Sequence, residues 1–322
     1  MHKRFVNHCT INLTLIPAGP ILIKSEEGAD PTKPNMEFVE TYHAGGRSIY
    51  LPGSSLKGAI RAHAERIVRT VGSERYNSQK PNIPWANDPL NDKYDYLKDK
   101  SSHDIYKLSS FTDQMFGNTS IASRFRIEDA YPIDSKQIKV EERNGVAIDR
   151  VFGSVAVGPF NYQVCTAGEF RTKIHLKNFS LAQLGLIGLV LRDLNDGWFG
   201  IGFGKSRGLG TVTVKFNSAV VQYPGCILED SKICVIGSQK QWIRTLLLGA
   251  GEFLTPEEAK RYGFFPEDST NLEDRQDTPV GGQPMDFGFG VKQTWTGEEQ
   301  VKDLFTRAVK SWSQLLRGGK AA

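Results

Sequence analysis

The sequence predicts an α+β fold: a ferredoxin-like or RRM-type domain with insertions and a helical C-terminal extension. Alternation of apolar and polar residues, typical of half-buried strands, marks the segments 9–16, 123–129, 160–176 and 211–216. Apolar residues at helical spacing mark helices through 56–71 and 181–194. Strand, helix, strands, helix, strand is the order of a ferredoxin-like domain. We expect this domain at 1–219 and the extension at 220–322.

The composition narrows the class of protein. The chain has 322 residues, of which 39% are hydrophobic and 24% charged, as in an ordinary globular protein. Because its net charge is only +4, nucleic-acid binding would depend on local clusters of cations. The absence of Cys-x-x-Cys spacing argues against a zinc ribbon and a disulfide scaffold. We see no signal peptide and no apolar run that could span a membrane, so we expect a cytoplasmic protein.

The segment between the first strand and the first helix is unusually long. Ile21–Ile23 is expected to extend the first strand or to pair with it. Residues 24–50 are polar and contain prolines, and a loop of this length is uncommon unless it is functional. It contains three carboxylates close together, Glu26, Glu27 and Asp30.

The stretch Leu51–Arg61, with the sequence LPGSSLKGAIR, predicts a tight turn that opens into a helix. Pro52 and Gly53 would make the turn, and Ser54 or Ser55 would cap the free amides of the first helical turn. A buried stripe is expected at Leu56, Ile60, Ala64, Ile67 and Val71.

Lys57 and Arg61 lie in the first turns of this helix. A helix start carries unpaired amides and a partial positive charge, which favour anions such as phosphate, and two cations strengthen that preference. The alternative is an ordinary amphipathic helix with a solvated basic side. The stretch is not a Walker phosphate loop, because Lys57 precedes Gly58 and no hydroxyl follows.

A second phosphate-suited segment runs from Gly200 to Gly210. Ser180 and Gln183 have capping-box spacing and open the apolar helix 181–194 that precedes it. The glycine-rich loop lets the backbone approach a phosphate chain while Lys205 and Arg207 neutralise charge. It lacks the spacing of the dinucleotide fingerprint. The alternative is a simple glycine-rich turn.

The remaining segments are less regular. Residues 73–115 read as a surface insertion. In the extension, 242–248 is predicted as a short helix, Thr255-Pro-Glu-Glu258 as a capping box, and 266–296 as irregular. A closing helix has an apolar stripe, which we expect to be buried on its own chain or on a neighbouring subunit. The stripe comprises Val301, Leu304, Phe305, Ala308, Val309, Trp312, Leu315 and Leu316.

Three motifs in order resemble signatures of the CRISPR-associated RAMP proteins, the guide-RNA-binding subunits of multi-subunit effector complexes. The first is Leu51–Arg61. The second runs from Arg143 to Arg150 and leads into the segment Val151 to Pro159. In the family this region, here about 143–160, is the thumb hairpin, which wedges between bases of the guide–target duplex. Val151, Val155 and Val157 suit that insertion; the alternative is a surface hairpin with buried valines. The third is the glycine loop, with Gly204, Lys205, Ser206, Arg207 and Gly208.

The resemblance is closest to the repeating backbone subunit of type III complexes. It implies that CRISPR guide RNA is bound by Ser54, Ser55, Lys57, Arg61, Arg143, Arg150 and the glycine loop, within a complex that contains other subunits. It also implies that an aspartate in the loop after the first strand cleaves the paired target RNA. Asp30 is the candidate and Glu26 and Glu27 are its alternatives, with a divalent ion, Mg²⁺ or Mn²⁺, held beside the scissile phosphate.

Two further functions stay open within the same resemblance. Some backbone subunits bind RNA without cutting it, which makes a non-catalytic scaffold the second reading. The third is a guide-processing endoribonuclease, a role that commonly uses a histidine, for which His43 and His63 are the candidates.

Overall fold

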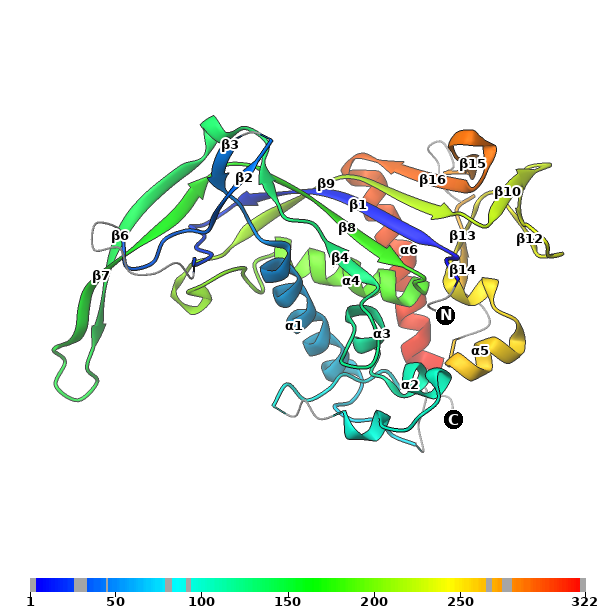
Figure 1. Cartoon of the computed structure of the whole chain (residues 1–322), viewed down its shortest axis with the longest axis horizontal. Helices are drawn as coiled ribbons and strands as arrows, with labels where there is room; N and C mark the ends of the chain where they lie inside the picture. The colour runs from blue at the N-terminus through cyan, green and yellow to red at the C-terminus, as the bar shows by residue number, and fades with distance from the viewer. Residues whose placement is uncertain are drawn as a thin grey trace.

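A seven-stranded antiparallel sheet forms the centre of the computed structural model, in which residues 4–25, 34–44, 46–78, 83–90, 94–264, 268–273 and 280–318 are described. The strands follow the order β15–β16–β9–β1–β8–β4, and β5 also pairs with β8 (Figure 1). Their bounds are β1 His8–Pro17, β4 Phe125–Ile127, β5 Tyr131–Pro132, β8 Phe170–Lys177, β9 Val212–Tyr223, β15 Gln283–Pro284 and β16 Val291–Thr296.

Four of these strands confirm the ferredoxin-like fold. Helix α1 (Gly53–Val71) lies between β1 and β4 in the chain, and α4 (Leu181–Asn195) lies between β8 and β9. The spatial order β9–β1–β8–β4, with antiparallel neighbours, is that of a split βαβ pair. Both helices cover one face of the sheet (Figure 1). The alternation in β1 follows from this, because Ile11, Leu13 and Leu15 face the helices and are buried.

The closing helix packs on its own chain, which confirms one of the two expected locations. Helix α6 (Gly297–Gly318) lies against α4 and β9. Two glycines of α4 allow this close approach: a Cβ on Gly185 would lie 2.4 Å from the carbonyl oxygen of Ala308, and one on Gly188 would lie 2.6 Å from the ring of Phe305. The capping box of α4 is confirmed, because Ser180 and Gln183 each bond the other's backbone amide.

The first loop holds more structure than the sequence indicates. Its 40–49 part forms a hairpin of β2 (Glu40–His43) and β3 (Gly46–Ile49). Ile21 does not extend or pair with β1, since its amide and carbonyl bond the backbone of Cys165. The expected strand 160–176 is in fact two, because the chain turns at Gly168, whose φ of +133° favours glycine. These are β7 (Val155–Ala167) and β8.

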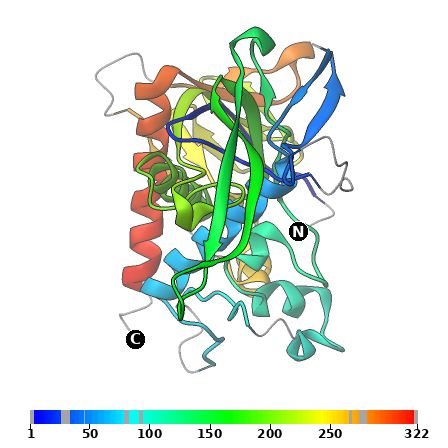
Figure 2. The same cartoon turned by 90° about the vertical axis from the view of Figure 1, so that its left-hand side faces the viewer.

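Strand β7 forms a long hairpin with β6 (Lys139–Ile148). The hairpin projects from the body at the left of Figure 1 and crosses the front of the molecule in Figure 2. It includes the expected thumb at 143–160 and is longer at both ends.

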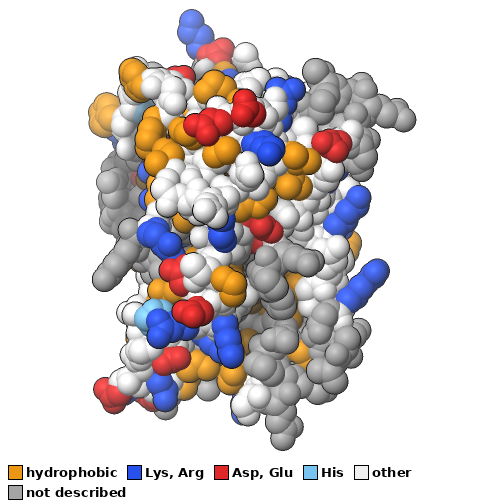
Figure 3. Space-filling model, turned by 90° about the vertical axis from the view of Figure 1, so that its right-hand side faces the viewer, with side chains coloured by type: hydrophobic (Ala, Val, Ile, Leu, Met, Phe, Trp, Pro, Cys, Tyr) orange, Lys and Arg blue, Asp and Glu red, His pale blue; other side chains and the backbone are white. Residues whose placement is uncertain are grey.

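The extension continues the same sheet. Strand β9 runs through residue 219 to Tyr223, and β16 pairs with its edge. The expected helix at 242–248 is wrong, because the segment forms β12 (Gln241–Ile243) and β13 (Leu246–Leu248). The expected irregular stretch contains β14 (Ser269–Asn271), β15 and β16, and the capping box at Thr255 is confirmed. Figure 3 shows the side on which the extension lies, where positive and negative side chains are mixed.

The insertion packs closely on the body. Its Trp85, Tyr106 and Met115 are buried. Among the described residues, no helix is long and apolar enough to cross a membrane.

The other elements are α2 Ser102–Leu108, α3 Asp113–Phe116, α5 Pro256–Tyr262, β10 Cys226–Glu229, β11 Lys232–Val235, and the short 3-10 turns Asp95–Leu97, Ser135–Gln137, Lys205–Arg207, Ala250–Phe253 and Asp286–Gly288.

Candidate nucleic-acid interface

The start of α1 is capped from another element. No side chain caps it locally, so the expected cap by Ser54 or Ser55 is wrong. Instead the Gly53 amide donates to Asp129 Oδ1 at 2.7 Å. Gly53 is required here because a Cβ would lie 2.5 Å from the carbonyl oxygen of Ile127. Ser54 is exposed and Ser55 half-buried, so both lie at an accessible helix start.

Near the end of α1, the buried stripe is shifted by one residue from the expected positions. Leu56, Ile60 and Ala64 are buried as expected, but Val71 is 44% exposed and Ile67 is only partly buried. Val68 takes their place in the core. In the last turn Val68 therefore faces the core, and Val71 faces solvent.

The two cations of α1 differ in what they contact. Lys57 donates from Nζ to Ser123 Oγ at 2.9 Å, and its pKa is lowered by burial and then by the charge of Arg61. The Arg61 guanidinium donates to Glu65 Oε1 at 2.8 Å, to the Gly117 carbonyl at 2.9 Å and to Asp113 Oδ1 at 2.8 Å. Arg61 therefore holds the insertion on α1, and Lys57 is the more accessible of the two.

Asp113 is the centre of this attachment. Its carboxylate is buried, and burial raises its pKa. It accepts from Arg61 and from Asn87 Nδ2, the latter at 2.6 Å. Arg69, one turn below Glu65, donates to the Asn87 carbonyl at 2.6 Å. We call Arg61, Asn87 and Asp113 the insertion clamp.

The glycine loop is a firmly anchored turn. Gly204 and Gly208 have φ of +70° and +81°, the left-handed region in which glycine is favoured, and they flank the 3-10 turn of Lys205–Arg207. The Phe203 amide donates to the Leu22 carbonyl at 2.7 Å, and the Gly210 amide to the Pro20 carbonyl at 2.8 Å.

The turn between these anchors presents its side chains outward. Lys205, Ser206 and Arg207 are all exposed. The Arg207 guanidinium lies 5.7 Å from the centre of the Phe203 ring. Two cations on a rigid, side-chain-poor turn suit a phosphate chain.

The tip of the β6–β7 hairpin is apolar and exposed, which rules out the alternative of buried valines. Val151 is 81% exposed and Phe152 84%. Asp149 Oδ1 accepts from the amides of both residues at 2.8 Å, which fixes the turn. The side chains of Ile148, Val155 and Val157 are also exposed.

The two arginines of this motif lie at different heights of the hairpin. Arg150 is exposed at the tip. Arg143 lies within β6, opposite Tyr162 of β7, and its guanidinium is 3.6 Å from Glu141.

The candidate histidines have structural partners. His63 is buried, its Nε2 lies 2.8 Å from Asp193 Oδ2, and its ring stacks on Phe199 at 4.3 Å. This pair joins α1, α4 and the loop that follows. His43 Nε2 lies 2.8 Å from Ser48 Oγ across the β2–β3 hairpin. Sequence reasoning missed Asp193, although an acid within an otherwise apolar helix signals a buried partner.

Asp30, Glu26 and Glu27 lie outside the described residues. The flanks of their segment are anchored by backbone bonds: the Ser25 amide donates to the Glu37 carbonyl at 3.0 Å, and the Met36 amide donates to the carbonyl of Asn161 in β7 at 3.3 Å. In the part of the chain that the structure describes, no group of three or more His, Cys, Asp or Glu could hold a metal ion.

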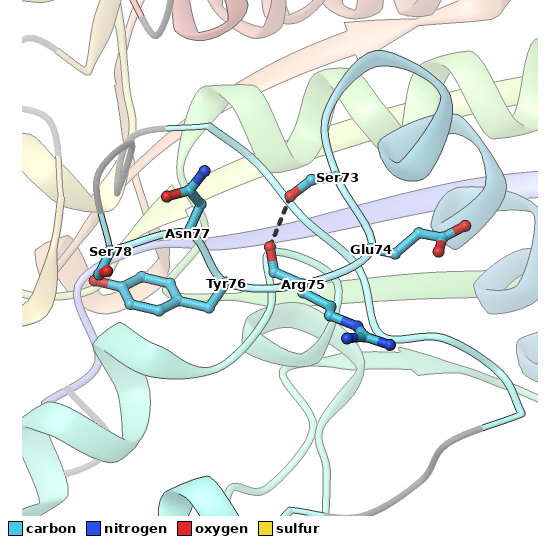
Figure 4. A pocket seen from close by; sticks show the side chains of 6 residues that line it. All are labelled: Ser73, Glu74, Arg75, Tyr76, Asn77 and Ser78. Carbon is cyan, nitrogen blue, oxygen red and sulfur yellow. Dashed lines mark hydrogen bonds between the residues drawn. The ribbon is translucent and has the colours of Figure 1, made fainter.

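A hollow of about 560 Å³ follows α1, but it contains none of the expected site residues. The single loop 73–78 lines it, with the Ser73 hydroxyl donating to the Arg75 carbonyl at 2.7 Å (Figure 4).

Comparison with known proteins identifies a family that contains the elements described above. None of the curated proteins matches the chain. The family model described as the RAMP superfamily matches residues 14–213, more than half of the sequence, from within β1 to the start of β9. The match includes the start of α1, the projecting hairpin and the glycine loop. The chain therefore belongs to the RAMP superfamily, whose members are CRISPR-associated proteins that generally bind CRISPR RNA within multi-subunit complexes.

Proposed function

We propose that this chain is a guide-RNA-binding backbone subunit of a type III effector complex and that it cleaves the complementary target RNA. The observation that carries the proposal is the projecting β6–β7 hairpin with its exposed apolar tip (Figure 2). Exposed large apolar side chains are unfavourable in water, and apolar wedges are a common means of separating stacked bases. Val151 and Phe152 at a fixed turn suit that role.

Guide binding would use the glycine loop and the start of α1. Lys205 and Arg207 are exposed on an anchored turn, and Lys57 lies in the first turns of α1, whose start is capped by Asp129. Each phosphate contact on single-stranded RNA contributes a slope of about 0.7 to the dependence of log K on log salt. Lys205→Gln with Arg207→Gln should therefore lower this slope by about 1.4 without changing the melting temperature.

Arg61 has a different part in this proposal. Because its guanidinium is occupied by the insertion clamp, Arg61→Gln should lower the melting temperature as well as the RNA affinity. Loss of affinity at full thermal stability would show instead that Arg61 contacts RNA directly.

Cleavage would depend on Asp30, assigned by its place in the sequence between β1 and α1. A divalent ion bound there would polarise the scissile phosphate. The adjacent 2′-hydroxyl would lose its proton to water and bond to phosphorus, giving a 2′,3′-cyclic phosphate. The bond to the 5′-oxygen would break, and that oxygen would take up a proton from water. Asp30 would hold the ion, with Glu26 and Glu27 as the alternatives, while guide contacts come from other residues.

The test is made in the assembled complex with labelled target RNA and Mg²⁺ or Mn²⁺. Asp30→Ala should abolish cleavage at the position served by this subunit while target affinity stays within a few-fold. Glu26→Ala and Glu27→Ala are the matched controls and should cut normally. If a glutamate variant fails and Asp30→Ala cuts, the residue is wrong. If the wild type shows no metal-dependent cutting, the non-catalytic scaffold is the better description.

The geometry gives less support to a guide-processing nuclease. Its candidate base His63 is 8% exposed and bound to Asp193, so an RNA 2′-hydroxyl has little access to its ring. Metal-independent cleavage of a guide precursor by the isolated chain, lost in His43→Ala, would restore that reading.

A further inference from the structure

The face of the central sheet opposite the helices is open and basic. Side chains on this face come from alternate residues of β8, beginning with Arg171 and Lys173, and from the residues paired with them. All are exposed or half-exposed except Thr14 of β1. Helices α1 and α4 lie on the other side of the strands (Figure 1). We call it the open face; its lysines and arginines are Arg126, Arg171, Lys173, Lys177, Lys215 and Lys292.

The strand register places these cations in rows across the sheet. Arg171 of β8 and Lys215 of β9 flank Thr14 of β1 in one row. Another row holds Lys177, His8, Gln222 and Lys292 in succession. Directly opposed residues share a face of a sheet, so all these side chains point to the same side.

The positive charge is largely uncompensated. Glu128 bonds Arg126 at 2.9 Å and His175 at 2.8 Å, and Asp286 lies 3.8 Å from Lys292. Among the described residues, Arg171, Lys173, Lys177 and Lys215 form no ion pair. The pKa of His8 is lowered by burial and further by the nearby charges of His175, Lys177 and Arg126, although a bond to Gln222 opposes this.

We propose that the open face binds the phosphate backbone of single-stranded RNA independently of base sequence, as a second contact beside the glycine loop. Alternate residues of a strand are about 6.7 Å apart, which suits successive phosphates of an extended strand. The spaces between the cations carry neutral hydrogen-bonding groups, such as the Asn12 amide bonded to Ser218 Oγ at 2.8 Å.

A protein partner fits this face less well than RNA. Interfaces between proteins depend on a central cluster of apolar or aromatic side chains. The aromatic rings of the open face lie at its ends and not in a central cluster: Tyr131, with Tyr50 and His43, is opposite Arg171, and Phe5 meets the edge of His8. Between them the face offers Val220, opposite Thr10. The end of the open face at Arg171 and Lys215 lies next to the segment after Pro17. In that segment the amides of Ala18 and Gly19 donate to the Thr211 carbonyl, beside the glycine loop. One RNA strand can therefore contact both surfaces in succession.

The test measures binding of a fluorescein-labelled oligouridylate to the full chain by anisotropy over a range of salt. The open-face variant combines R171Q, K173Q, K177Q and K215Q. Its control removes four exposed charges elsewhere, in K232Q, K260Q, R261Q and K310Q, and so has the same net charge. The open-face variant should lose up to about 2.8 in salt slope, at about 0.7 per contact, while the control keeps the wild-type slope. All three proteins should melt at the same temperature, since the replaced side chains are exposed.

Equal slopes for the open-face variant and the control would overturn the inference. The variant K205Q with R207Q separates it from the proposed function. If only that variant loses slope, the glycine loop is an RNA site and the open face is not; if only the open-face variant does, the inference stands alone. A labelled polyglutamate peptide is the second probe. Loss of peptide binding with unchanged RNA binding would assign the face to an acidic protein and refute the RNA site.

Discussion

Replacing Gly58 by alanine should stabilise the protein. Gly58 lies inside α1, is exposed, and a Cβ built on it meets nothing within 4 Å. Glycine in a helix interior is less favourable than alanine by about 0.8–1 kcal/mol. Gly58→Ala should therefore raise the free energy of unfolding by about 1 kcal/mol, read from urea denaturation as a higher midpoint with an unchanged m-value.

Gly185 is the matched control, because it is also a helical glycine but is closely packed. A Cβ there would lie 2.4 Å from the carbonyl oxygen of Ala308 and 2.7 Å from its carbon, both backbone atoms of α6. Overpacking of this kind costs about 1–3 kcal/mol, which exceeds the propensity gain. Gly185→Ala should therefore destabilise the protein. If Gly58→Ala lowers the midpoint, or Gly185→Ala raises it, the account of these helices is refuted.

Gly58 also links stability with RNA binding. Nothing in the free protein requires a glycine there, whereas Lys57 beside it is expected to contact the guide. If RNA approaches α1 at this point, Gly58→Ala should weaken RNA binding even though the protein becomes more stable. Unchanged affinity would place the RNA farther from the helix.

Three further predictions concern stability. Asp113→Ala should cost about 2–3 kcal/mol in urea denaturation, because Arg61 loses a buried partner but keeps its other contacts. Burial raises the pKa of Asp268 to about 6, so the folded state holds this proton more tightly than the unfolded state. This group should therefore lower the free energy of unfolding by up to about 3 kcal/mol as pH rises from about 4 to 6, a dependence that Asp268→Asn should remove. Trp312→Ala should cost about 3–5 kcal/mol, measured in the same way, since its ring is buried and contacts Phe111 of the insertion.

Elements with local signals could be predicted from the sequence. The capping boxes at Ser180 and Thr255 depend on residues three apart, and the stripe of α6 repeats over several turns, so neighbouring residues carry the information. The order of strands and helices then determines the ferredoxin-like core. The projecting hairpin could also be located through its resemblance to a family signature, and the glycine loop through its run of glycines.

Elements that depend on partners far away in the sequence could not be predicted. The six residues of β16 do not by themselves predict a strand. They form one because the edge of β9 is available for pairing. The apolar run 246–248 is too short to distinguish a helix from a strand by periodicity. The division of 160–176 into two strands depends on the backbone conformation of Gly168, which alternation does not reveal.

The same limit applies to the candidate site. The sequence indicates that Arg61 is a cation near a helix start, but its partner Asp113 is 52 residues away. No local pattern connects these two residues. From the sequence alone, an arginine that holds the insertion in place therefore resembles a phosphate ligand. His63 is a similar case, because its partner Asp193 lies on another helix.

The packing of α6 has a consequence for synthesis on the ribosome. Helix α4, which precedes the glycine loop, ends at Asn195, but the helix that covers Gly185 and Gly188 begins only at Gly297. The edge of β9 on this side likewise stays unpaired until β16 has been synthesised. Domains generally fold as units during translation, and unpaired edges are exposed until their partners emerge. The nascent chain therefore carries all three family motifs before the elements that support them are complete. If these motifs bind RNA as proposed, we expect tight binding only after α6 has left the ribosome.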